Sequence, residues 1–343
     1  MPFVLDEGLR NWLSGAIGEG SVSEGGFIWR GSLKRGATAL RTIQLFLNVT
    51  DTALSYHPDW PPVTGVNGMV LIDDTNVSVW AERARLYGSQ VKHLSAEAWM
   101  EPGEGMQLAL LGQVEGPAAD GLRTVNESLL GELTGGAFSG WDATGALSTT
   151  LDMQLSLARP SSPPRVEVST TWRDVDLDIA PGALRVESLN GEFDYSSATG
   201  FSSTGLQGKL WGKPLTLAVR PLRDSQRVPG RLPAAVTLDL ASTLHMADLG
   251  DWLGLEFLAL ASGSSDVAAQ VIVEPGATPQ LALRSDLVGV ALDLPQPWAK
   301  PAPERRALRA TLGLGGEALP LELALGDDLR MGLSIAVGGL GAG

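Results

Sequence analysis

Apolar and polar residues alternate along several segments of the chain, a pattern typical of β-strands with one buried face. The alternation is clearest in residues 43–49, 151–157 and 236–240, and residues 288–294 and 321–325 repeat it. Because successive side chains of a strand point to opposite faces, the apolar residues of each segment share one face. The pattern predicts a mainly β protein whose antiparallel sheet meets apolar material on one side and water on the other.

The apolar material has two candidate sources. It is either a second layer of the protein itself, as in a sandwich or barrel, or lipid held in a groove. For a groove, the candidate lining residues are the apolar members of the alternating segments: Ile43, Leu45, Leu47, Val49, Leu151, Met153, Leu155, Leu157, Val236, Leu238, Leu240, Val290, Leu292, Leu321 and Leu323.

Three segments have apolar residues at helical spacing, and each precedes glycine-rich sequence and further strands. They are residues 5–17, which end before Gly18, residues 122–133, which end before Gly135, and residues 247–258. Glycine directly after an apolar stripe is a common end of a helix. We expect these short amphipathic helices to cap or cover part of the sheet.

The chain also contains an internal repeat. Six residues recur at an offset of 123 positions without a gap, and Leu86-Tyr87-Gly88 recurs as Leu210-Trp211-Gly212 after a one-residue insertion. A weaker third copy begins near Trp252 and reaches Asp286 and Pro295. The six residues are Asp51, Leu54, Pro58, Val63, Asn67 and Gly68 in the first copy, and Asp174, Leu177, Pro181, Val186, Asn190 and Gly191 in the second.

The repeat predicts two units, residues 1–118 and 119–240, and a partial third unit, residues 241–343. Successive copies would extend the same face, so we expect an elongated, repetitive sheet with one continuous apolar lining. The dipeptides Asn67-Gly68 and Asn190-Gly191 predict type I′ hairpin turns, because both central residues of that turn have positive φ.

Charge and cysteine content narrow the range of functions. The formal net charge of −14 disfavours binding to nucleic acid and docking on anionic lipid headgroups. The chain has no cysteine, so we expect neither a disulfide framework nor a thiolate metal site. No signal peptide is recognisable at the start, and no run of about 18 apolar residues would span a bilayer.

The three histidines do not form a recognisable active site. His57, His93 and His245 are far apart in sequence, and none has a partner at metal-ligand spacing. His57 and Asp59 are close enough to act together, but the prolines around them predict a rigid turn. The chain has no nucleophile-elbow, Walker A or dinucleotide-binding glycine motif.

The carboxylate pairs also have structural explanations. Residues 73–74 and 327–328 are adjacent aspartates at predicted hairpin ends, where solvated turn chemistry accounts for them. Asp51, Asp174 and Asp286 recur once per copy of the repeat, which suits a structural role better than an active site. We therefore expect no enzymatic activity, no catalytic residues, no metal and no cofactor.

Several segments resemble the YhdP branch of the AsmA-like proteins of Gram-negative bacteria. They are residues 26–31 (GFIWRG), 56–67 (YHPDWPPVTGVN), 186–191 (VESLNG) and 210–215 (LWGKPL). The most distinctive is residues 294–304 (LPQPWAKPAPE), which is similar to a recurrent proline-lysine-proline stretch of the family. These motifs are structural, and the resemblance extends over nearly the whole chain.

The resemblance implies a strongly curved, taco-like β-groove that carries phospholipid through the periplasm between the inner and outer membranes. The expected partners are phospholipid acyl chains and membrane components reached through other parts of a longer protein. We expect a periplasmic segment whose inner-membrane tether, a transmembrane helix, is absent from this chain. The alternative is a structural or scaffolding envelope protein whose apolar core is closed and conducts no lipid.

Overall fold

A computed structural model describes residues 15, 18–32, 41–55, 60–128, 138–157, 163–179, 184–221, 236–273, 279–314 and 318–336. Two α-helices, α2 (Ala118–Asn126) and α4 (Met246–Leu253), and one 3-10 helix, η2 (Glu256–Leu260), accompany the strands in this part of the chain. The strands are β1 (Ser21–Gly31), β2 (Arg41–Leu54), β3 (Val63–Asp73), β4 (Asn76–Leu86), β5 (Ser89–Glu101), β6 (Gly105–Pro117), β7 (Asp142–Ser156), β8 (Arg165–Ile179), β9 (Leu184–Ser196), β10 (Gly200–Leu210), β11 (Lys213–Pro221), β12 (Val236–His245), β13 (Ala261–Val273), β14 (Gln280–Ser285), β15 (Val290–Leu292), β16 (Leu308–Gly313), β17 (Ala318–Leu325) and β18 (Leu329–Ala336).

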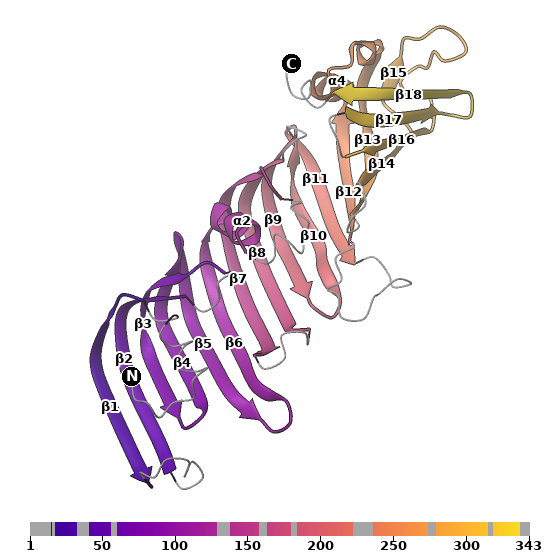
Figure 1. Cartoon of the computed structure of the whole chain (residues 1–343). Helices are drawn as coiled ribbons and strands as arrows, with labels where there is room; N and C mark the ends of the chain where they lie inside the picture. Colours follow the sequence, from indigo (N-terminus) through magenta and orange to yellow (C-terminus); the bar gives the residue numbers. More distant parts are fainter. Residues whose placement is uncertain are drawn as a thin grey trace.

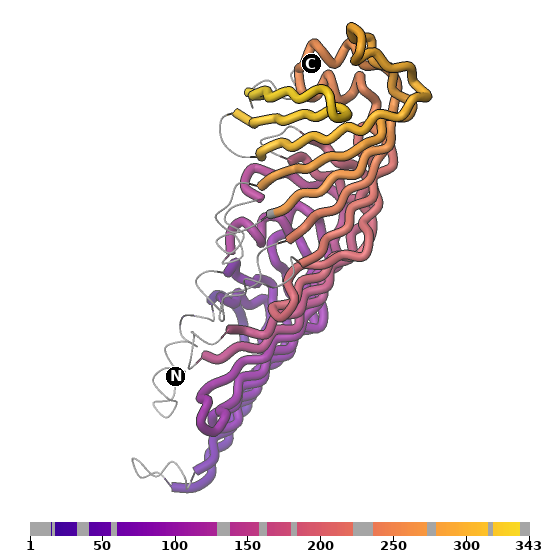
Figure 2. The backbone as a smooth tube through the Cα atoms, turned by 90° about the vertical axis from the view of Figure 1, so that its right-hand side faces the viewer, coloured from indigo at the N-terminus to yellow at the C-terminus, as the bar shows by residue number. Residues whose placement is uncertain are grey.

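The strands form one elongated antiparallel sheet of 18 strands across the described residues (Figures 1 and 2). Almost every strand pairs with the strand that follows it in the chain, from β1 to β14 and from β16 to β18. The exception is β15, which pairs with the start of β13, so that β14 pairs with β16. The two end strands β1 and β18 do not pair with each other, so the sheet stays open, as the predicted groove-like fold class requires.

Four of the five alternating segments are strands, as predicted. Residues 43–49 lie in β2, residues 151–156 in β7, residues 236–240 in β12 and residues 321–325 in β17. The prediction for residues 288–294 is wrong, because only the three residues of β15 are extended. Leu287 and Gly289 have φ values of 50° and 93°, which turn the chain just before this short strand.

Two of the three predicted helical segments contain helices among the described residues, and their bounds differ from the apolar patterns. Apart from Gly15, the segment at residues 5–17 lies outside the described residues. Helix α2 ends at Asn126, and residues 129–133 of the same prediction also lie outside the described part. The predicted helix at residues 247–258 is divided, because Gly254 adopts a left-handed conformation with φ 62° and ends α4 before η2 begins.

The repeat corresponds to a β-bulge that occurs twice at the same offset. The pairing of β2 with β3 shifts on both sides of Thr52, and the pairing of β8 with β9 shifts on both sides of Val175, 123 residues later. The bulged residues Asp51 and Asp174 have φ values of 51° and 46°. The asparagine of each copy stabilises its bulge, because the Oδ1 atoms of Asn67 and Asn190 accept hydrogen bonds from the main-chain N–H of Asp51 and Asp174, at 3.2 and 3.0 Å.

The predicted hairpin turns at Asn67-Gly68 and Asn190-Gly191 are therefore wrong. Both dipeptides lie inside strands, β3 and β9, where the asparagine amide bonds to the neighbouring strand instead of closing a turn. The glycine is needed for close backbone packing, since a Cβ atom on Gly68 would lie 2.1 Å from the main-chain oxygen of Trp80. A bulge bends its strand and increases the local twist, which curves the sheet at both copies.

Candidate functional site

Pairing between strands places candidate lining residues of β2, β7, β12 and β17 in apolar rows on one side of the sheet, which we call the apolar face. Residues that pair across an antiparallel ladder point to the same side. One row crosses β2 to β8 and a second crosses β2 to β7, both without a polar residue. The first row is Leu47, Val70, Val79, Ala96, Leu110, Met153 and Val166, and the second is Leu45, Ile72, Val77, Ala98, Leu108 and Leu155.

The apolar face continues into the C-terminal strands. A row from β11 to β18 consists of Val219, Leu238, Val271, Leu281, Leu312, Leu321 and Leu333. Aromatic residues of β9 and β10 connect the two regions: Tyr195 pairs with both Val168 and Phe201, and the Tyr195 and Phe201 rings lie 4.7 Å apart. The face is therefore apolar along most of the sheet.

From β7 onward the opposite face is charged and exposed to water. Asp239 accepts hydrogen bonds from Gln270 at 2.9 Å and from Arg220 Nε at 2.7 Å, and these bonds lower the pKa of its carboxyl. Arg185 forms ion pairs with Asp176 and Asp178, both at 2.9 Å. From β7 onward the sheet is therefore amphipathic, with one side suited to water and the other to apolar material, whereas in β2 to β4 the opposite side also carries Phe46, Leu71 and Trp80.

Helix α2 covers the apolar face near the second bulge. Its residues Ala118 and Leu122 belong to a packed cluster with Val175, Val186 and Leu189, of which Val175 is 0% exposed. In this region the sheet and its helix make an ordinary closed core.

Polar contacts attach α2 to the turn between β4 and β5. Glu127 accepts hydrogen bonds from the Tyr87 hydroxyl at 2.8 Å and from Arg123 Nε at 2.9 Å. The Arg123 guanidinium carbon lies 4.0 Å from the centre of the Tyr87 ring, and Ser89 donates to Asp120 at 2.7 Å. These contacts link α2 to the β4–β5 turn and the start of β5.

Part of the apolar face has no such cover among the described residues. We call it the open stretch. Its side chains are half-buried, and none of them belongs to the packed clusters found in the described ranges. At its margin, Met100 is 50% exposed and Leu157 is 47% exposed. The open stretch comprises Leu108, Leu110, Met153, Leu155, Val166 and Val168.

The other candidate lining residues differ in how deeply they are packed. Val290 and Leu321 are 0% and 6% exposed and belong to packed clusters near α4. Leu292 and Leu323 pack against the same clusters, as Leu240 does against the cluster under α2. Leu45 and Leu47 pack on Val70, Ile72 and Val77, while Ile43 is buried, and Val49, Leu151, Val236 and Leu238 are half-buried.

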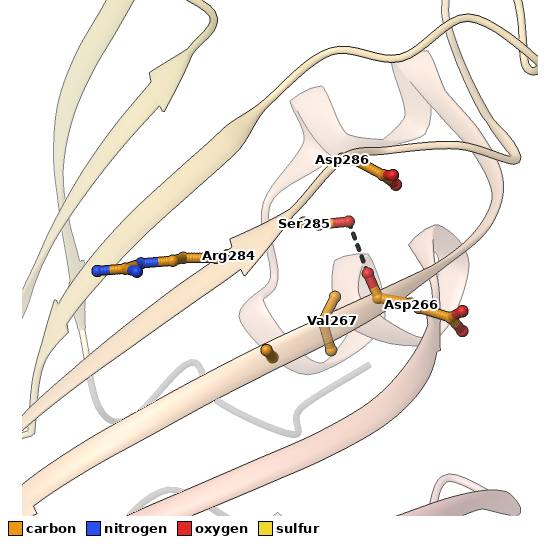
Figure 3. Close-up of a pocket in the computed structure, with 6 residues that line it drawn as sticks. Asp266, Val267, Arg284, Ser285 and Asp286 are labelled. Atoms are coloured by element: carbon orange, nitrogen blue, oxygen red, sulfur yellow. Dashed lines mark hydrogen bonds between the residues drawn. The ribbon is translucent and has the colours of Figure 1, made fainter.

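Among the described residues, no catalytic arrangement is evident in the depression between the middle of β13 and the end of β14 shown in Figure 3. The Ser285 hydroxyl donates to the main-chain oxygen of Asp266 at 2.8 Å and accepts from Leu287 N–H at 3.1 Å. Arg284 points away from the Asp266 and Asp286 carboxylates (Figure 3). Ser285 therefore serves the turn after β14, and no group of metal-ligating side chains occurs in the described part of the chain.

His57 and Asp59 are outside the described residues, whereas Asp73-Asp74 and Asp327-Asp328 occupy hairpin turns as predicted. Asp74 has a structural contact, since its Oδ1 accepts from Ile43 N–H at 2.7 Å.

Sequence reasoning missed the structural part played by Lys300. This lysine is 2% exposed, and its ammonium group donates to the main-chain oxygens of Leu287, Val290 and Pro301 at 2.8, 2.5 and 3.2 Å. Burial lowers the pKa of Lys300. The prolines on either side of Ala299-Lys300 were the available signal, because they restrict the chain to a fixed loop around the charged group.

In the part of the chain that the structure describes, no helix is long and apolar enough to cross a membrane.

A family model described as YhdP protein matches residues 1–340. The chain is also similar to the Intermembrane phospholipid transporter YhdP of Escherichia coli (strain K12), with 22% identity over 311 residues. The match covers 89% of this chain and 24% of the relative, so the chain spans about a quarter of that protein's length. No solved structure matches.

Proposed function

The chain belongs to the YhdP family, and from this premise we propose that its apolar face carries phospholipid acyl chains as one segment of a bridge between membranes. The observation that supports the proposal is the open stretch, where apolar rows continue from strand to strand without a second protein layer among the described residues. An amphipathic sheet of this kind leaves lipid headgroups in water while its apolar face shields the acyl chains.

The energetics are sufficient for this task. Burying one methylene group gains about 0.8 kcal/mol, so a chain of about 16 carbons gains on the order of 10 kcal/mol. Because contact between apolar groups is non-directional, a lipid keeps similar contacts as it moves from one pair of strands to the next. The rows have no ladder position at which a polar side chain would interrupt such movement between β2 and β7.

In this proposal the segment works in the periplasm, and other parts of a longer protein supply the inner-membrane tether and the contacts with membrane components. The proposal assigns no catalysis to the chain. The relative's printed name, which describes an intermembrane phospholipid transporter, supports the substrate class and the cell envelope as the location.

A scaffolding role is the second candidate, because the clusters under α2 and α4 are closed cores. Mass spectrometry of the purified chain, under conditions that preserve bound lipid, distinguishes the lipid-carrying function from the scaffolding role. We expect phospholipid to copurify, and a photoreactive phospholipid to label peptides of β6, β7 and β8. A folded chain that carries no lipid and is not labelled would favour the scaffold and overturn the proposal.

A further inference from the structure

The C-terminal end of the apolar face is occupied by the chain itself. Residues 246–260, which comprise α4 and η2 and connect β12 to β13, pack onto the inner side of the last strands (Figure 1). The contributing side chains include Leu249, Trp252, Leu253, Leu255 and Leu258.

The surface beneath this segment is the same face that stays open further along the sheet. Leu281, Leu312 and Leu321 are members of the row that starts at Val219 and Leu238. Leu238 is half-buried and lies outside the cluster beneath α4 and η2, although Val219 in β11 is 3% exposed, and Leu312 and Leu321 are 4% and 6% exposed beneath the segment. The leucine-rich segment therefore fills the position that acyl chains occupy in the proposed function.

A second loop packs against α4. Residues 286–306 fold back so that β15 pairs with the first residues of β13, and Asp293 N–H donates to the Leu260 oxygen at 2.8 Å. Lys300 holds this loop together through its bonds to main-chain oxygens. Leu249 packs against both the cluster beneath α4 and the cluster beneath the loop.

Residues 246–260 are held on the sheet mainly by apolar packing, which an acyl chain could replace. Helix α4 has eight residues, and neither α4 nor η2 has a side-chain hydrogen bond at its N-terminal cap. Helices this short are not stable in isolation, so their structure depends on apolar packing. Part of that packing is the contact between Trp252 and Trp211, whose ring centres are 5.8 Å apart. An acyl chain offers the sheet the same non-directional contact.

We propose that residues 246–260 are a plug, which closes the acyl-chain path at β14 to β18 and is displaced when lipid enters that end of the sheet. This inference rests on the proposed function and adds a point of control to it. The path would be permanently open along the open stretch and conditionally open at the C-terminal strands.

The test uses the full chain and a phosphatidylethanolamine that carries a diazirine in one acyl chain, with the labelled peptides mapped by mass spectrometry. In the wild type we expect label in β6, β7 and β8 and little in β16, β17 and β18. The double variant Trp252→Ala/Leu258→Ala removes two large apolar contacts of the plug and should raise labelling of the C-terminal strands about tenfold relative to β6–β8. Asp251→Ala, an exposed position on the same helix, is the matched control and should label like the wild type.

The outcomes separate the plug from the proposed function. Equal labelling of β16–β18 and β6–β8 in the wild type would overturn the plug, as would a folded double variant labelled only in β6–β8. Absence of label from every strand of every variant would instead overturn the proposed function. If the double variant loses its β-sheet circular dichroism, the single variant Leu258→Ala is measured in the same way and judged by the same criteria.

Discussion

Replacement of Leu155 by aspartate probes the apolar face where no second layer covers it among the described residues. Leu155 is half-buried and pairs with Leu108 across β6 and β7, in the middle of the open stretch. Its neighbour Gln154 is exposed and points to the opposite face. Gln154→Asp therefore places the same carboxylate in the same strand, on the side that lipid would not touch.

The expected loss in lipid affinity follows from burial. A leucine side chain gains about 1.5–3 kcal/mol on full burial, and the accessible part of Leu155, at most about a third of the side chain, would contribute about 0.5–1 kcal/mol to an acyl contact. Covering a carboxylate with an acyl chain costs at least about another 1–3 kcal/mol. The sum of about 1.5–4 kcal/mol corresponds to an affinity roughly 10-fold to several hundred-fold lower.

The fold should tolerate this change. Because Leu155 already has contact with water, Leu155→Asp should lower the free energy of unfolding by only about 1 kcal/mol. Val175→Asp should lower it by several kcal/mol, since Val175 is 0% exposed in the core under α2. Crosslinking of a photoreactive phospholipid measures affinity, and urea unfolding measures stability. A folded Leu155→Asp protein that is labelled as strongly as the wild type would refute the reasoning, and so would equal losses in Leu155→Asp and Gln154→Asp.

Three further changes test the contacts that shape the sheet, each measured by urea unfolding. Partial burial and, as a smaller cause, the hydrogen bond to Glu127 raise the pKa of Tyr87 from its ordinary value of 10.0 to about 12. Protonated Tyr87 therefore contributes its full stabilisation below pH 10, and this contribution is lost as the pH rises through 12. Tyr87→Phe should show a smaller loss over this range than the wild type, and an identical loss would contradict the assignment. Asn190→Ala removes the hydrogen bond that supports the bulge at Asp174 and the bond to the Ser188 oxygen, and should lower the free energy of unfolding by about 1–2 kcal/mol. An unchanged value would mean that the bulge does not depend on this side chain. Lys300→Met leaves buried main-chain oxygens without a donor and should cost about 2–4 kcal/mol, whereas a variant as stable as the wild type would show that water or a neighbouring group replaces the ammonium.

The asparagine-glycine pairs show where reasoning from sequence alone stops. Asn-Gly between extended segments is a strong hairpin signal because both residues readily adopt positive φ. Here neither asparagine has a positive φ, and of the two glycines only Gly191 does, at 138°. The left-handed residues are Asp51 and Asp174, sixteen residues before the asparagines, on the strand that pairs with them. Local preference identified residues with an unusual backbone role, but only the pairing of β2 with β3 and of β8 with β9 decided that the role is a bulge.

For the alternating segments in β2, β7, β12 and β17, the sequence determined both that they are strands and which residues share a face. The physical reason is that these features depend on the two-residue period of a strand and on residues close in the chain. The length of β15 was not predictable in this way, because the turn at Leu287 and Gly289 is supported by Lys300, which lies 13 residues after Leu287 and outside the two-residue period of the strand.

Only the tertiary structure decided which part of the apolar face is open. Leu155 and Leu321 have the same alternating pattern in the sequence, yet one is half-buried in the open stretch and the other is 6% exposed beneath α4 and η2. The difference arises because burial depends on what packs against a strand from elsewhere in the chain, and a period of two residues carries no information about that neighbour.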